Sequence, residues 1–218
     1  MRLSIQALFV ILCIVMGNGR SSAQSAVEQL GTLPQWEEAQ SAHRDGLSEI
    51  TILRLNEIKQ HAGLVPEAHL RIRHLLVESL VRAGRFEDAL ANAKGNELPF
   101  WRGLAHAQLG RLSEAETLLI QCATDTGHAE KEEAILTLSA TLNQLAGANH
   151  AGEFLAGEIN KPGNEDLSAR PRLALVELHL EQGKYQAALK TLKGFQANDA
   201  TSTMIRASVN LLEARTLI

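Results

Sequence analysis

Eight histidines and two cysteines are the residues of this chain best suited to hold a metal or act as nucleophiles, but their spacing favours neither role. No His-x-x-x-His, Glu-x-x-His or Cys-x-x-Cys spacing, which would bring ligands together, occurs in the sequence. His106 and His179 each lie four residues before a glycine, and we interpret them as half-buried structural imidazoles, with a metal or pH-dependent role as the alternative. We expect no metal and no cofactor.

Patterns for covalent or acid–base catalysis are also missing. The Gly-x-Ser-x-Gly motif does not occur, and Cys122 follows the apolar run Leu118–Ile120, so we expect a buried, unreactive thiol. The carboxylate pairs Glu37–Glu38 and Glu132–Glu133 are adjacent residues, which point about 100° apart on a helix and cannot share one site. The sequence therefore predicts a protein that is not an enzyme.

The sequence offers more residues suited to binding a protein or peptide than residues suited to catalysis. Five arginines gather in a chain whose formal net charge is −4: Arg71, Arg73, Arg82, Arg85 and Arg102. Guanidinium groups capture carboxylates in a bidentate manner, and Trp and Arg are common anchors of interfaces. The alternative is a solvated arginine face beside aromatics that pack in the core. Because Lys and Arg are not in broad excess, a nucleic-acid partner is not expected.

Four strings that begin with glycine share one pattern. Each has a small residue five positions after the glycine, and three have an aromatic residue or Leu at the third position. The strings are Gly84–Ala89, Gly110–Ala115, Gly147–Gly152 and Gly183–Ala188. Apolar residues at helical spacing precede each glycine, so we expect one helix to end there and another to begin. The small residue would let the two helices approach closely.

This pattern resembles the tetratricopeptide repeat (TPR), a family whose unit of about 34 residues pairs two helices. The resemblance covers residues 69–196. Whether residues 34–65, around Gly46, form a further, degenerate repeat is left open. It implies an all-α, right-handed superhelical solenoid of antiparallel helix hairpins with about four to five units. The interval from Gly84 to Gly110 is the shortest between these glycines. It predicts that the second helix of this unit, which follows Gly84, is shortened and ends before Pro99.

The resemblance also implies a set of binding residues, because the first helices of such units line a concave groove. Projecting the family's register gives Arg71, His74, Glu78, Arg82, Phe100, Trp101, Gln108, Thr141 and Gln144 as partner-binding candidates. The last unit adds Arg170, Glu177 and Glu181 to the same predicted groove.

The N-terminus is similar to a secretory signal peptide. Arg2 precedes an apolar run, Leu8–Met16, which is shorter than the roughly 20 residues that span a bilayer. Ser21 and Ala23 are small residues placed for cleavage before Gln24, although a retained anchor is the alternative. We divide the chain into a signal peptide (1–23), an N-terminal helical segment and possible degenerate repeat (24–66), TPR-like repeats (67–200) and a C-terminal helix (201–218). That helix would be a cap or the start of a truncated repeat.

These features predict an exported protein, periplasmic or extracellular, that binds a protein or peptide and touches a membrane only through a transient signal peptide. One alternative is a helical accessory domain or fragment of a larger envelope protein or enzyme. Another is a peptidoglycan- or carbohydrate-associated factor, whose groove would need more aromatic platforms than Phe100 and Trp101 provide. The sequence leaves the oligomeric state open.

Overall fold

Every regular element in the part of the chain that the structure describes is a helix, which confirms the predicted all-α class. The computed structural model describes residues 23–193 except 62, 94, 96, 126, 128, 165 and 166. The predicted signal peptide, apart from its last residue, and the predicted C-terminal helix lie outside the described residues. None of the helices described is both long and apolar enough to cross a membrane.

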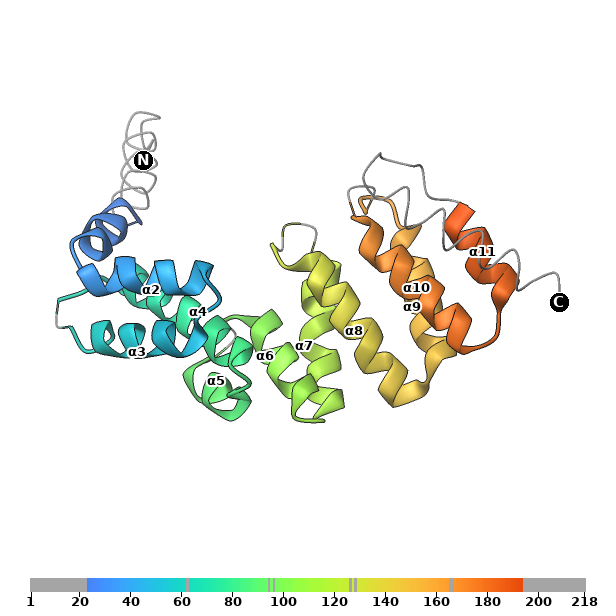
Figure 1. Ribbon diagram of the computed structural model, residues 1–218, viewed down its shortest axis with the longest axis horizontal. Coiled ribbons are helices and arrows are strands. Elements are labelled where there is room, and N and C mark those ends of the chain that lie inside the picture. Colours follow the sequence, from blue (N-terminus) through green and yellow to red (C-terminus); the bar gives the residue numbers. More distant parts are fainter. Residues whose placement is uncertain are drawn as a thin grey trace, which may run out of the picture. The chain divides into compact units, whose positions relative to one another are not determined.

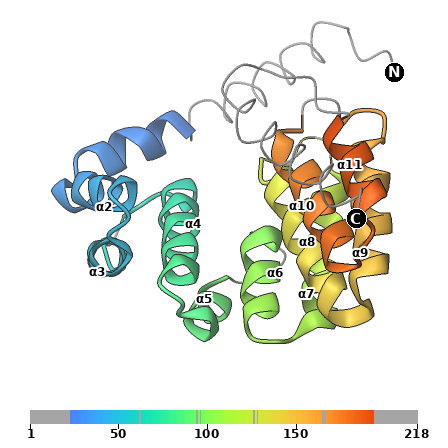
Figure 2. The ribbon, with the colours of Figure 1, turned by 45° about the vertical axis from the view of Figure 1, so that its right-hand side comes forward.

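The chain divides into two compact units, residues 1–101 (the N-terminal unit) and residues 102–218 (the C-terminal unit). A helical segment at residues 23–31 is followed by α2 (Pro34–Arg44), α3 (Ser48–Ile58), α4 (Pro66–Arg82), α5 (Phe86–Asn92), α6 (Pro99–Gln108), α7 (Leu112–Thr124), α8 (Lys131–Ala146), α9 (Ala148–Ile159), α10 (Ala169–Glu181) and α11 (Tyr185–Lys193). Within the N-terminal unit α2 to α5 pack consecutively, and within the C-terminal unit α7 to α11 do the same (Figures 1 and 2).

Four glycines end helices in the same way. Gly46, Gly84, Gly110 and Gly183 have φ between +68° and +74°, the left-handed region that glycine adopts without strain. Each glycine N–H is donated to the carbonyl three residues earlier, and the next residue's N–H to the carbonyl five residues earlier. This pair of bonds is the Schellman motif. Gly147 differs, because its ψ is 170° and its N–H is donated to the Asn143 carbonyl four residues back.

The small residues five positions after these glycines are buried, as the sequence predicts. Ala89, Ala115 and Ala188 are at most 1% exposed, and Thr51 occupies the same place after Gly46 with no exposure. A larger side chain at any of them would push the paired helices apart. The third position is less uniformly buried, because Tyr185, which occupies it after Gly183, is 38% exposed.

Many of the long-range side-chain contacts fall within one narrow range of sequence separation. Hydrogen bonds and ion pairs join residues 33 to 37 positions apart: Gln29–Val65, His43–Ser79, His43–Glu78, Glu49–Arg85, Lys59–Asn92, Lys131–Asn164, Glu132–Ser168, Glu133–Arg170 and Asn149–Lys184. In the N-terminal unit they connect the helical segment 23–31 to the residue before α4, α2 to α4, and the ends of α3 to those of α5. In the C-terminal unit they connect α8 to the start of α10 and α9 to the turn before α11. Alternate helices are therefore tied together within each unit.

The structure can be compared with the sequence at two places where the pattern is irregular. The helix after Gly84, α5, has only 7 residues, and the chain then reaches Leu98, whose φ of +59° is left-handed, before α6 begins at Pro99. The segment around Gly46 is a helix pair, because α2 packs on α3 across this turn. Residues 34–58 therefore have the same local structure as the helix pairs that follow.

Candidate partner-binding surface

The helix α4 carries a row of polar residues on one face. Arg71, His74, Glu78 and Arg82 lie at i, i+3, i+7 and i+11, so turns of about 100° per residue keep them on one side of the helix. The opposite side is buried through Ile72, Leu76, Val77 and Leu80. Pro66 is the first residue of the helix. The positive charge of Arg82, in the last turn, interacts favourably with the negative end of the helix dipole. This predicted face is therefore formed by ordinary amphipathic packing.

A polar network joins this face to α2. The carboxylate of Glu78 accepts from Arg82 (Nη2–Oε1 2.7 Å) and lies 3.3 Å from His43 Nε2. The other ring nitrogen of His43 is 3.4 Å from the hydroxyl oxygen of Ser79. Glu78 is therefore already neutralised by its own chain, and its effect is to orient Arg82, whose side chain remains 50% exposed.

Ser79, His43 and Glu78 have the residue types of a hydrolytic triad, but the serine is inaccessible. Ser79 has no exposed surface, and no substrate carbonyl can reach its hydroxyl while the helices stay packed. Cys122 is likewise fully buried, as predicted, and its Sγ donates weakly to the Leu118 carbonyl at 3.4 Å. Burial, followed by the nearby Glu130 and Asp125, raises the pKa of this thiol to about 11. Both groups are structural in this geometry.

The aromatic pair beside α4 separates into one buried and one accessible residue. Phe100 is only 4% exposed and meets Trp101 edge-on, with ring centroids 5.0 Å apart. We correct the assignment of Phe100 as a partner-binding residue, because a partner cannot reach a ring that is only 4% exposed. Trp101 is half-buried and donates its indole N–H to His74 Nε2 at 3.2 Å. The pair therefore brings Trp101, and not Phe100, to the polar face of α4.

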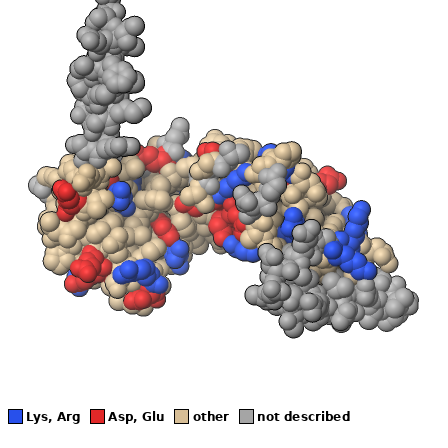
Figure 3. Space-filling model, turned by 90° about the horizontal axis from the view of Figure 1, so that it is seen from above, with Lys and Arg blue, Asp and Glu red and all other residues tan. Residues whose placement is uncertain are grey.

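The predicted arginine cluster is mostly compensated by carboxylates. Arg73 pairs with Glu97, and Arg85 pairs with Asp88 and Glu49. Over much of the face shown in Figure 3, acidic and basic side chains lie close to one another. Arg71 is exposed and, among the described residues, makes no ion pair or hydrogen bond. Arg71 is therefore the member of the cluster with the most freedom to bind a partner.

Sequence reasoning missed residues of α2 that border the same face. A cavity of about 190 Å³ lies between α2 and α4 and is lined by Gln40, His43, Arg44 and Leu75. Gln40 and Arg44 lie six and two residues before Gly46, the same distances that separate Glu78 and Arg82 from Gly84. Projecting the register onto the unit around Gly46 would have found both residues.

The predicted partner-binding residues of the C-terminal unit differ in their exposure. Gln108 and Gln144 are exposed, but Thr141 is only 2% exposed and donates its hydroxyl to the Thr137 carbonyl at 2.8 Å. We correct this assignment too. The projected register fails here because α8 ends at Gly147 without the Schellman geometry, and the structure exposes Ala140 in place of Thr141.

The described geometry defines an all-helical protein with an exposed, mixed-charge face on α2 and α4. No protein-family model matches the chain. A comparison with curated proteins finds no match either.

Proposed function

We propose that this chain is a TPR-like repeat protein whose helix pairs stack into a right-handed solenoid. The observation that carries the proposal is the recurrence of side-chain contacts at separations of 33 to 37 residues in both units. This separation is close to the period of about 34 residues expected when each helix pair packs on the next pair. The four matching Schellman turns and the buried small residues after them support the same reading.

The proposed function is non-catalytic binding of a protein or peptide, with α2 and α4 as the binding face of the N-terminal unit. Arg71 offers an exposed guanidinium that no described residue pairs with, and Arg82 is held in place by Glu78. Trp101 and the cavity beside Leu75 add apolar contact area close to these cations. Such a face suits a peptide with carboxylates next to apolar side chains. We propose that this binding takes place outside the cytoplasm, in the periplasm or beyond, and the resemblance of the N-terminus to a signal peptide supports this location.

The experiment that tests this function is affinity capture by the full chain from an envelope extract, repeated with an Arg71→Glu/Arg82→Gln variant. Arg82 is changed to Gln because a glutamate there would repel Glu78 and could unfold α4. We expect the variant to lose its partner, with affinity reduced at least about tenfold once the partner is purified.

A matched control is Lys193→Glu, which reverses one exposed charge at the end of α11. This control should retain the partner. If the Arg71→Glu/Arg82→Gln variant captures the partner as well as the parent while keeping its helical circular dichroism, the assigned face is wrong.

A further inference from the structure

A second candidate binding site lies in the C-terminal unit, among α9, α10 and α11. These helices border a cavity of about 390 Å³, which is within the range of roughly 300 to 1,000 Å³ that is usual for small-molecule sites. Ile159 and Leu175 contribute apolar surface to its wall. Asn160, Arg172, His179 and Lys190 contribute polar groups. The wall thus combines an apolar part with several hydrogen-bond donors.

The cavity is on the opposite side of α10 from the predicted groove residues. Arg172, Leu175 and His179 lie at i, i+3 and i+7 and line the cavity. Arg170, Glu177 and Glu181 are all exposed and, at about 100° per residue, fall on the other side of the helix. A ligand in this cavity would therefore not compete with a partner held along the Arg170–Glu181 row.

The charges around the cavity favour an anion. Its wall includes Arg172 and Lys190, and none of the described residues that line it is Asp or Glu, although the whole chain carries a net charge of −4. Lys190 makes no ion pair or hydrogen bond with any described residue, so its ammonium group is available. Cations in a partly enclosed wall without carboxylates attract an anionic group strongly.

His179 supplies a polar atom that is buried without a partner. Its Nδ1 has no hydrogen-bond partner among the described residues, which is uncommon for a buried polar atom. Burial, and then the nearby Lys184, lowers the pKa of this imidazole, so the neutral form is favoured. The neutral ring keeps one protonated nitrogen that can donate to an oxyanion, and because Nδ1 has almost no exposed surface, Nδ1 would reach a ligand only after a rotation of the ring.

The walls are held by a small core. Val176 of α10 packs with Ala188, Leu189 and Leu192 of α11, and all four are at most 8% exposed. Because this core fixes α10 against α11, the groups on Arg172, His179 and Lys190 are carried by elements that already pack together.

We propose that this cavity binds a small molecule that carries a phosphate or carboxylate group next to a short apolar part. The oxyanion would meet Lys190, Arg172 and His179, and the apolar part would lie against Ile159 and Leu175. This inference does not depend on the partner-binding face of α2 and α4, which belongs to the other unit.

The test is isothermal titration calorimetry of the full chain with phenyl phosphate and with hexanoate, using phenethylamine as a cation of similar size. We expect at least one of the two anions to bind and the amine not to bind. Lys190→Gln should weaken anion binding about tenfold or more, because it removes a charge-assisted hydrogen bond. Lys190 is exposed, so this variant should fold normally, and circular dichroism checks this.

Lys193→Gln removes the same charge from the same helix without touching the cavity wall and should leave the affinity unchanged. Arg71→Glu, in the other unit, should also leave it unchanged, which separates this site from the proposed partner-binding face. The proposal is overturned if neither anion binds at millimolar concentration, if the amine binds equally well, or if Lys190→Gln and Lys193→Gln bind alike.

Discussion

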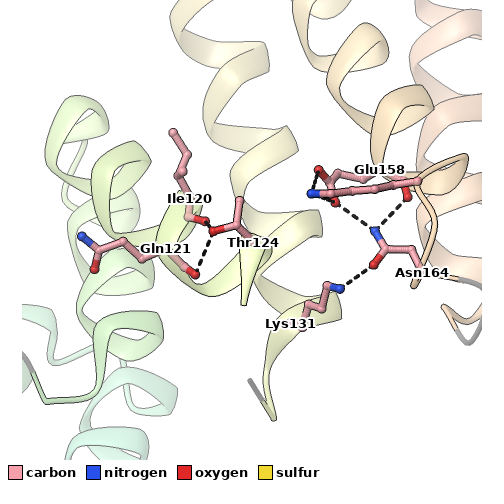
Figure 4. Close-up of polar contacts among 7 residues, drawn as sticks. Ile120, Gln121, Thr124, Lys131, Glu158 and Asn164 are labelled. Atoms are coloured by element: carbon pink, nitrogen blue, oxygen red, sulfur yellow. Dashed lines mark hydrogen bonds and ion pairs between the residues drawn. The ribbon is translucent and has the colours of Figure 1, made fainter. Parts of the chain in front are cut away.

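The side-chain amide of Asn164 holds the carboxylate of Glu158 inside the C-terminal unit. Asn164 Nδ2 donates to Glu158 Oε2 and to the Glu158 carbonyl, both at 2.9 Å, while its Oδ1 accepts from Lys131 Nζ (Figure 4). Lys161 completes the ion pair with Glu158 at 3.0 Å. Glu158 and Asn164 are 9% and 5% exposed, so this network replaces water around a buried charge.

Replacing Asn164 with Ala should destabilise the protein by about 1 to 3 kcal/mol, because a buried carboxylate and a carbonyl each lose a donor. Urea unfolding followed by circular dichroism measures the change. Asn149→Ala is the control, since Asn149 is exposed and its partner Lys184 can turn to water. Equal losses of stability in the two variants would show that burial of the Asn164 network does not matter.

Two glycine-to-alanine changes should have opposite signs. Gly84 has φ +74°, and a Cβ there would meet no atom within 4 Å, so Gly84→Ala should cost about 1 to 2 kcal/mol through backbone strain alone. Gly157 lies inside α9, also with open space, and Gly157→Ala should stabilise by up to about 1 kcal/mol. Thermal unfolding of both variants checks the prediction, and it fails if they shift the midpoint in the same direction.

Gly103 lets α6 approach α7 closely. A Cβ at this position would lie 2.9 Å from Leu119 Cγ and 3.0 Å from Leu119 Cδ2, and Leu119 is fully buried. Gly103→Ala should therefore destabilise the C-terminal unit by about 1 to 3 kcal/mol through overpacking. The double variant Gly103→Ala/Leu119→Ala should lose less than the sum of the two single variants in a double-mutant cycle. Additive losses would contradict the close contact.

Cys122 should make stability depend on alkaline pH. Because burial raises its pKa from 9.0 to about 11, the thiol ionises first in the unfolded chain. The unfolded state is then favoured as pH rises through this interval, and stability is lost between pH 9.0 and about 11. Urea midpoints of the parent and of Cys122→Ala over this range provide the test. The parent should fall more steeply, whereas parallel curves would show that the thiol does not contribute.

The positions of the helix ends were predictable because their causes are local. A left-handed glycine stops a helix wherever it occurs, and this rule located the turns at Gly84, Gly110 and Gly183 from their immediate neighbours. The small residues at Ala89, Ala115 and Ala188 follow for a similar reason, since two helices joined by a tight turn must approach within a few residues of it. The same reasoning failed at Gly147, where a different turn moves the register of α8 and buries Thr141.

The candidate surface was less predictable because it depends on residues far apart in the chain. The sequence does not reveal that Arg82 is bound to Glu78 while no described residue pairs with Arg71. His43 reaches Glu78 only because α2 packs beside α4, and the burial of Phe100 arises only when the chain is folded. The sequence by itself determined where helices begin and end, since backbone conformation is a local property. The tertiary structure alone decided which charges are paired and which faces are open, since pairing and burial depend on distance in space.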